Sequence, residues 1–188
     1  MILVVGLGNP GKEYKGTRHN IGREIAAAFR DKGGLPDFRF EKKWNAEVGE
    51  GKIGKERVAV LLPDTMMNKS GNAVSPAVRF YKVKPKSVFL IHDDADIELG
   101  RAKLSFGKHS AGHKGVESVR RALGTWDFWR LRVGIQKKKR VDAMKLVLQK
   151  FTPVEETVLK KVKKKLLEGL LLILDAGPEK AINLINKN

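Results

Sequence analysis

The chain has 188 residues, with 38 Lys and Arg against 21 Asp and Glu, a formal net charge of +17 and no Cys. Its length predicts one domain with a core large enough to need no covalent cross-link, and the lack of Cys excludes disulfides, thiolate metal sites and a cysteine nucleophile. The charge favours a polyanionic partner (nucleic acid, an acidic membrane or an acidic protein), although a lysine-rich surface that aids solubility or heat resistance is the alternative.

Strands are predicted at regular intervals along the first 150 residues. Four apolar runs have the length of buried strands, namely Ile2–Val5, Val58–Leu62, Val88–Ile91 and Leu131–Ile135. Asn45–Val48 and Ala102–Phe106 have the pattern of half-buried or edge strands.

Helical spacing of apolar residues predicts helices between these strands. One begins near Arg18 and ends at Gly33, a second spans Ala73–Tyr81 with its start near Pro76, and a third spans Val116–Leu123. A long helix is expected from Thr152 to about Asp175 and a short one around Ala181–Ile185. The alternation predicts one three-layer α/β domain over residues 1–188, with a mixed, mostly parallel sheet flanked by helices.

Neither a membrane span nor a signal peptide is expected. The longest apolar run, Leu166–Leu174, is interrupted by Glu168 and Gly169 and is too short to cross a bilayer. Met1 leads directly into Ile2–Val5, without the basic start of a signal peptide. We therefore expect a cytoplasmic protein.

Basic residues are concentrated towards the C-terminus. Residues 136–165 hold eleven Lys and Arg but only three acids. Four of the lysines, Lys160, Lys161, Lys164 and Lys165, share one flank of the predicted long helix. They form either a surface for a polyanion or an ordinary solvated helix face.

A glycine-rich turn follows the first predicted strand. Gly6–Gly11 has the spacing G-x-G-x-x-G of a dinucleotide-binding loop. No helix follows directly, and no acid ends a second strand to hold a ribose, so NAD(P) is not expected. The glycines still permit a sharp turn at the sheet edge. The side chain of Asn9, in this turn, either recognises a peptide-like amide or caps its own loop.

His19 and a group of acids are the next candidates for chemistry. A neutral imidazole at the start of the first helix suits a general base, although His19 could also be a capping or packed residue. Asp93, Asp94 and Asp96 follow the predicted strand Val88–Ile91. Such acids hold a metal ion, orient the imidazole of a histidine base or form a structural turn.

Two further polar segments are candidates for the same sheet edge. His109 and His113 have the i, i+4 spacing of some zinc sites, but the glycines around them predict a loop. We favour a flexible, cationic cover over a polyanion for this loop. The segment Pro63–Asn72 is rich in Asn, which either lines the edge or caps a helix.

Taken in order, these motifs resemble those of bacterial peptidyl-tRNA hydrolases. The resemblance is carried by Gly6–Gly11 with Tyr14, Thr17–Gly22, Met67–Gly71, His92–Asp93, Gly112–Gly115 and Arg130–Ile135. It spans about residues 1–186. It implies a monomeric, cytoplasmic esterase that needs no metal or other cofactor and frees tRNA from N-blocked peptides, so that the partner is peptidyl-tRNA.

The resemblance also implies roles for individual residues. His19 matches the catalytic base of the family, and Asp93 matches the acid that stabilises this base. Asn9 matches the residue that discriminates N-blocked from free aminoacyl-tRNA. Tyr14 and Asn68 match positions that contact the substrate.

Three positions depart from the family's pattern. Met66 stands where an aromatic residue is usual, Lys114 replaces an Asn that contacts substrate, and Ser105 replaces a basic residue that grips the 5′ phosphate of tRNA in some relatives. The ammonium of Lys114 would hold a phosphate or a carbonyl group. The candidates that take over the phosphate grip are Lys103, Lys108 or Lys114, together with Arg132.

The mechanism that follows is general base catalysis. His19 takes a proton from the water that attacks the ester carbonyl, while Asp93 holds the imidazole. Asn9 and Asn68 supply amide donors to the developing oxyanion.

Two alternative functions remain open from the sequence. One is a metal-dependent nuclease that uses Asp93, Asp94 and Asp96. The other is a non-catalytic RNA-binding protein on the same scaffold.

Overall fold

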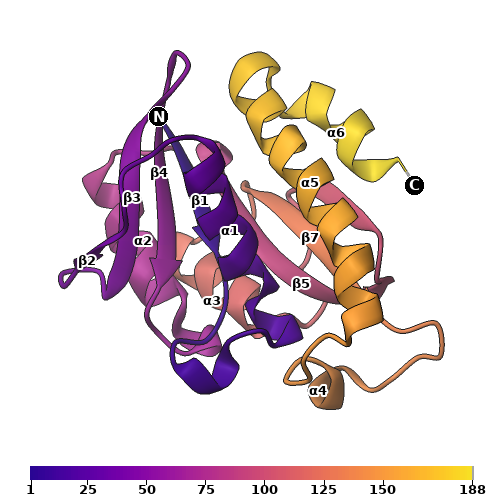
Figure 1. The fold of residues 1–188 in the computed structure, drawn as a ribbon. Helices are drawn as coiled ribbons and strands as arrows, with labels where there is room; N and C mark the ends of the chain where they lie inside the picture. Colours follow the sequence, from indigo (N-terminus) through magenta and orange to yellow (C-terminus); the bar gives the residue numbers. More distant parts are fainter. Residues whose placement is uncertain (188) are drawn as a thin grey trace.

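A seven-stranded sheet forms the centre of the computed structural model, which describes residues 1–187 (Figure 1). The strands are β1 (Ile2–Gly6), β2 (Arg39–Glu41), β3 (Ala46–Ile53), β4 (Glu56–Pro63), β5 (Val88–Glu98), β6 (Ala102–Phe106) and β7 (Trp129–Gln136). Their order in the sheet is β2-β3-β4-β1-β5-β7-β6. The central strands β4, β1, β5 and β7 are parallel, and the flanking strands β2, β3 and β6 pair antiparallel with their neighbours.

Helices cover both faces of this sheet. They are α1 (Ile21–Lys32), α2 (Gly71–Phe80), α3 (Lys114–Leu123), α4 (Ala143–Leu146), α5 (Pro153–Ala176) and α6 (Pro178–Asn186). Helices α1, α5 and α6 bury apolar side chains on one face, and α2 and α3 bury theirs on the other. The result is the predicted three-layer α/β architecture with a mixed, mostly parallel sheet.

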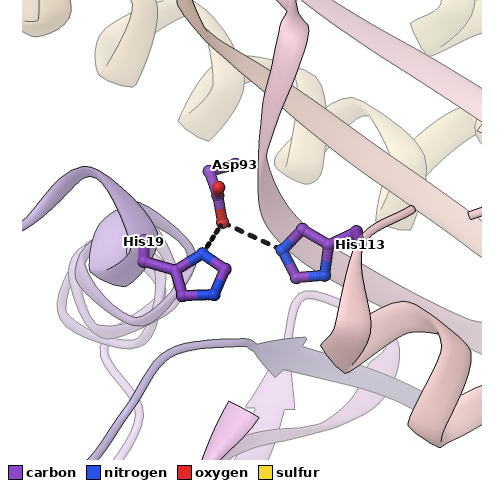
Figure 2. A group of neighbouring side chains, drawn as sticks. All are labelled: His19, Asp93 and His113. Atoms are coloured by element: carbon purple, nitrogen blue, oxygen red, sulfur yellow. Dashed lines mark hydrogen bonds and ion pairs between the residues drawn. The ribbon is translucent and has the colours of Figure 1, made fainter. Parts of the chain in front are cut away.

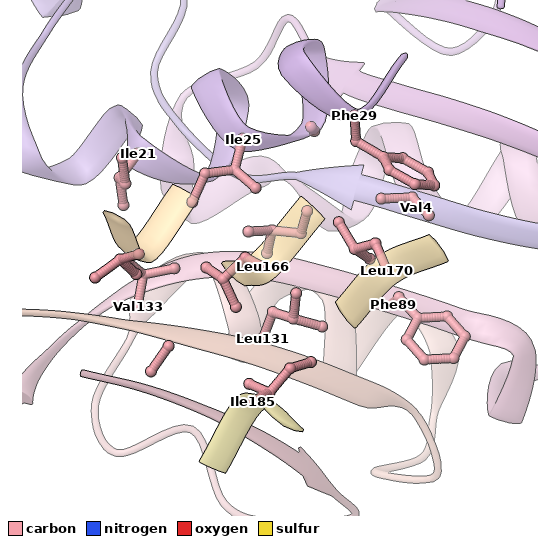
Figure 3. Packing of buried hydrophobic residues seen from close by; sticks show 14 of the residues in the cluster. Val4, Ile21, Ile25, Phe29, Phe89, Leu131, Val133, Leu166, Leu170 and Ile185 are labelled. Carbon is pink, nitrogen blue, oxygen red and sulfur yellow. The ribbon is translucent and has the colours of Figure 1, made fainter. Parts of the chain in front are cut away.

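Successive residues of a strand point to opposite faces, which is why the central strands are apolar throughout. Val4 of β1 packs under α1 and α5, whereas Leu3 and Val5 join the cluster under α2 and α3. Figure 3 shows the first cluster, where Ile25 of α1 and Leu166 of α5 lie over the sheet. Both layers of helices are therefore held by the same strands.

The predicted buried strands and the long C-terminal helix are confirmed. Thr152 caps α5 in a capping box, in which its side chain accepts the N–H of Glu155 and Glu155 accepts the N–H of Thr152. The strand predicted over Val88–Ile91 is longer than expected, because β5 stays paired with β7 beyond Ile91. Asp93 and Asp94 therefore lie within the strand rather than after it.

Other boundaries were wrong or missed. Helix α2 begins at Gly71, so Pro76 lies inside it rather than at its start. The three-residue strand β2 and the four-residue helix α4 were not predicted, since both are too short to show a hydrophobic period. No helix within residues 1–187 is long and apolar enough to cross a membrane.

Gly22 provides a test of how closely α1 packs on the sheet. A Cβ at this position would lie 2.2 Å from the carbonyl oxygen of Ile91 and 2.7 Å from that of Leu7. We expect Gly22→Ala to lower the free energy of unfolding by about 3 kcal/mol, the upper part of the range for overpacking, because the backbone cannot yield.

Urea denaturation measures this effect, with Gly51→Ala in β3 as the control. A Cβ at Gly51 would meet the end of the Leu35 side chain at 3.0 Å and Pro36 Cδ at an ordinary 3.6 Å, so a loss below about 1 kcal/mol is expected. Equal losses for the two variants would contradict the close contact between α1 and β5.

Candidate active site

The carboxyl ends of the parallel strands deliver polar side chains to one edge of the sheet. Asn9 follows β1, Asn68 follows β4, and Asp93 lies within β5, just beyond the last residue of that strand that pairs with β1. His19 joins them from the 3₁₀ turn Arg18–Asn20, directly before α1. In open α/β sheets this edge is where ligands bind.

A pocket of about 410 Å³ opens at this edge. Its polar lining includes Asn9, His19, Asn68, Asp93, His113 and Lys114. Its apolar lining comes from Met66 and from the segment around α4, with Met144, Val147 and Leu148. The pocket therefore brings hydrogen-bonding groups and an apolar surface to one place.

One carboxylate oxygen connects the two histidines of the pocket (Figure 2). Asp93 Oδ1 lies 2.8 Å from His19 Nδ1 and 2.9 Å from His113 Nε2. The Asp93 side chain is 2% exposed, whereas that of His19 is 14% exposed. These three residues, His19, Asp93 and His113, form a triad with a buried acid and an imidazole, that of His19, that reaches the pocket.

Backbone hydrogen bonds determine which nitrogen of His113 carries a hydrogen. His113 is the N-cap of α3, and its Nδ1 accepts the N–H groups of Gly115 and Val116 at 3.2 and 3.3 Å. The hydrogen of the neutral ring is therefore on Nε2, which donates to Asp93. His19 donates to the same oxygen through Nδ1, so its Nε2 is the basic nitrogen of the triad.

Asp93 is held in its anionic form. Burial by itself would raise the pKa of this carboxyl group. The electrostatic effects and hydrogen bonds of His113 and His19 outweigh burial and hold the pKa of Asp93 well below its ordinary value. An anionic carboxylate can orient an imidazole and stabilise the imidazolium that forms when the imidazole takes a proton.

His92 supports the triad without lining the pocket. Its ring is fully buried, its Nδ1 donates to the backbone oxygen of Asp93 at 2.6 Å, and its ring centroid is 4.6 Å from that of His113. Burial is the main cause that holds the pKa of His92 well below its ordinary value. The ring is thus a neutral packing partner at pH 7.

Asn9 is held in one orientation by hydrogen bonds at its backbone and side chain. Its N–H donates to Asn20 Oδ1 at 2.8 Å, and Asn20 Nδ2 donates to its carbonyl at 2.9 Å. Its own side-chain oxygen accepts the N–H of Met67 at 2.7 Å. Because Oδ1 is used in this way, Nδ2 is the end of the Asn9 side chain that serves a ligand.

The acids predicted as a possible metal cluster have separate partners. Asp94 accepts from Arg132 Nε at 2.7 Å and from the N–H of Asp96 at 2.9 Å. Asp96 pairs with Arg140 at 2.6 Å. The carboxylates of Asp93, Asp94 and Asp96 therefore do not converge on one centre, as a metal-dependent nuclease would need.

Within residues 1–187, one group has the spacing of metal ligands, and it is the triad itself. The ligand atoms of His19, Asp93 and His113 lie within 4.8 Å of one another. However, His113 Nε2 carries a hydrogen and has no lone pair for a metal. The donor pattern fits a hydrogen-bonded triad.

The predicted site residues divide into two sets. Those that line the pocket are Asn9, His19, Met66, Asn68, Asp93 and Lys114. Those outside its lining are Tyr14, Lys103, Lys108 and Arg132, of which Arg132 is joined to the pocket residue Asp94. Lys103 is the cross-strand neighbour of Arg132. Lys108 is exposed in the loop between β6 and α3, and Tyr14 is half-buried in the turn Lys12–Tyr14.

Sequence reasoning missed His113 and Asn20. From the sequence, residues 107–115 were predicted to form a loop and His113 was considered only as a zinc ligand. The structure shows instead that His113 is the N-cap of α3 and contacts Asp93. His109, which was considered as the second ligand of a zinc site, packs on Trp126, with 5.6 Å between the ring centroids. Asn20 directly follows His19, but its contact with Asn9 has no local signal.

A family model described as Peptidyl-tRNA hydrolase matches residues 3–188 of the sequence. The chain belongs to the peptidyl-tRNA hydrolase family. Relatives with this name include one from Aquifex aeolicus, 42% identical over 98% of this chain and 96% of its own length, and one from Mycobacterium sp. strain KMS, 41% identical over the same shares. The family makes the chain a carboxylic ester hydrolase, which excludes the non-catalytic alternative.

The solved structures agree with the fold. The crystal structure of peptidyl-tRNA hydrolase from Acinetobacter baumannii superposes with a TM-score of 0.91 at 33% sequence identity, over 99% of this chain and 94% of the other. The resemblance inferred from the motifs is therefore confirmed at the level of the family and the fold.

The buried His92 of this hydrolase predicts a pH dependence of stability. Below the pKa of an unfolded His, about 6.5, the unfolded chain binds a proton that folded His92 does not. The free energy of unfolding therefore decreases as the pH is lowered. Compared with His92→Gln, the wild type should lose stability between pH 7 and 5, by up to about 1.4 kcal/mol per pH unit.

Urea denaturation at several pH values measures the difference between the two proteins. Asp93, with its lowered pKa, contributes stability above the pKa of an unfolded Asp, about 3.9, and this contribution is lost only at lower pH. Its effect therefore lies outside the window of His92. Parallel stability curves for wild type and His92→Gln would contradict a neutral His92.

Proposed function

We propose that this hydrolase cleaves the ester bond between an N-blocked peptide and the 3′ ribose of tRNA, with His19 as the general base. The observation that carries the proposal is the 2.8 Å contact between His19 Nδ1 and buried Asp93, which leaves Nε2 as the base at the pocket. The names of the relatives, peptidyl-tRNA hydrolases, support the substrate.

The reaction is a hydrolysis in two steps. A water attacks the carbonyl carbon and gives a proton to His19 Nε2, while Asp93 stabilises the imidazolium. The tetrahedral intermediate then expels the ribose oxygen, which takes the proton, so the products are a peptide acid and tRNA with a free hydroxyl. Such base catalysis contributes about 10²- to 10⁴-fold to the rate.

Two amide groups are placed to bind the substrate carbonyls. Asn68 is exposed in the turn Met67–Lys69 at the pocket, and Asn9 presents Nδ2 there. Donors held before the reaction stabilise the developing oxyanion better than mobile water does. Because Asn9 is held in one orientation, its Nδ2 is also suited to donate a hydrogen bond to the amide of a blocked N-terminus.

The apolar residues of the pocket suit the peptide part of the substrate. Met66, Met144 and Leu148 are 45%, 76% and 55% exposed. Exposed apolar side chains gathered at one pocket are typical of a binding surface. In this proposal Met66 takes the place of the aromatic residue that is usual in the family.

The basic residues beside the pocket suit the phosphates of tRNA. Asp94 holds Arg132 through Nε, which leaves both Nη groups for a phosphate. Lys103 is paired across the sheet with Arg132, and Lys114 is the first residue of α3, where a helix end favours an anion. Lys108 extends this basic surface, and Ser105 adds no charge to it.

The setting of the reaction follows from the substrate. Translation produces peptidyl-tRNA in the cytoplasm, so we place the enzyme there, acting as a monomer and as one domain. The attraction between its charge of +17 and tRNA should weaken as salt rises.

Replacing the base tests the mechanism. We expect His19→Ala to lower the rate of N-acetyl-aminoacyl-tRNA hydrolysis by about 10²- to 10⁴-fold. His109→Ala, which lies outside the pocket, is the control and should keep the rate within about twofold. A His19→Ala variant that keeps more than a tenth of the wild-type rate would remove His19 from the role of base.

EDTA should leave the wild-type rate unchanged, and a loss in EDTA would favour a metal-dependent reaction.

Asn9→Asp tests the recognition of the blocked N-terminus. Aspartate retains an oxygen for the N–H of Met67 but has no amide donor for the substrate. We expect the preference for N-acetylated over free aminoacyl-tRNA, measured as the ratio of kcat/KM values, to fall about tenfold, as the loss of one hydrogen bond predicts. An unchanged ratio would show that another group discriminates.

A further inference from the structure

Arg18, directly before the base His19, is fully buried and does not line the pocket. A buried guanidinium is costly unless it is paired and hydrogen-bonded. The partners of the Arg18 side chain therefore indicate its role in the structure.

The guanidinium binds two elements far away in the sequence. Its Nη2 lies 2.6 Å from Glu155 Oε2, and its Nη1 donates to the carbonyl of Ile135 at 3.2 Å. Its Cζ lies 4.7 Å from the centre of the Phe151 ring. Arg18 thus joins the turn of His19 to the end of β7 and to the start of α5.

Glu155 is itself fixed by α5. The same oxygen that binds Arg18 also accepts the N–H of Thr152, at 2.8 Å, in the capping box. The anchor of Arg18 is therefore part of the helix terminus and not a mobile surface carboxylate.

The backbone of Arg18 and His19 is hydrogen-bonded to the segment that carries Val147 and Leu148 of the pocket lining. The N–H of Arg18 donates to the carbonyl of Gln149 at 2.9 Å, and the N–H of His19 donates to that of Val147 at 2.8 Å. Thr17 forms a β-bridge with Lys150. The turn of the base and the Val147–Lys150 segment therefore form one hydrogen-bonded unit.

We propose that Arg18 is a positioning residue, which through Glu155 and Ile135 holds His19 and the Val147–Leu148 wall in fixed relation to each other. The planar guanidinium donates to the two acceptors from two separate nitrogen atoms in a fixed fork, whereas the three donors of a Lys ammonium share one nitrogen and lack this geometry. Displacement of a catalytic group by about 1 Å can cost about 10²-fold in rate. This inference rests on the proposed role of His19.

Steady-state hydrolysis of N-acetyl-aminoacyl-tRNA, measured well below the thermal midpoint of every variant, tests the proposal. We expect kcat to fall about tenfold in Arg18→Lys and about 10²-fold in Arg18→Gln, with KM within about twofold. Glu155→Gln keeps an oxygen for the Thr152 N–H but removes the charge, and its kcat should fall about tenfold. If the pair acts as one unit, Arg18→Lys combined with Glu155→Gln should lose no more than the larger single change.

Glu24→Gln is the matched control. It removes an ion pair between α1 and α5, from Glu24 to Lys163 Nζ at 2.7 Å, without touching the turn of His19. Because this pair is partly exposed, its loss should lower the thermal midpoint less than the Arg18 variants do, and it should leave kcat unchanged. Folded Arg18→Lys and Glu155→Gln variants with wild-type kcat, or with a changed KM alone, would overturn the positioning role.

His19→Ala separates this inference from the proposed function. An inactive His19→Ala beside fully active Arg18 variants would refute only the positioning role. An active His19→Ala would refute the proposed base itself, whatever the Arg18 variants do.

Discussion

A single carboxylate oxygen organises the candidate site, because Asp93 Oδ1 accepts hydrogen bonds from two imidazoles that belong to different parts of the chain. One imidazole, that of His19, lies in the turn directly before α1, and the other, that of His113, caps α3. Both contacts require the acid to sit at the edge of the sheet, buried and anionic. The two layers of helices that cover β5 exclude water from Asp93, and the two N–H groups replace that water.

The sheet and its functional edge could be predicted because their signals are local. Runs of four or five apolar residues mark strands that are covered on both faces, and their parallel pairing brings the following polar residues together. Asn9, Asn68 and Asp93 therefore reach one pocket as the pattern of strands suggests. The pairing of β5 with β7 is not local, which explains why the strand was predicted to end too early.

The connections within the site could not be predicted, since each depends on residues far apart or on backbone groups. His113 contacts Asp93 because the N–H groups at the start of α3 fix its ring, and the surrounding glycines hide this helix start in the sequence. Asn20 holds Asn9 across eleven positions. The apolar part of the pocket depends on α4, whose four residues carry no helical period.

The pairing of Arg18 with Glu155 spans 137 positions of the chain, one of the longest separations between partners in the molecule. Closing a loop of this length costs conformational entropy before the contact repays it. The segment that supports His19 also comes from residues beyond 146. During synthesis Arg18 and the neighbouring base are made 137 residues before Glu155, so the base exists before its support. The site is therefore complete only once α5 is present, and a fragment that ends before Val147 has the residues of the triad without the segment that supports them.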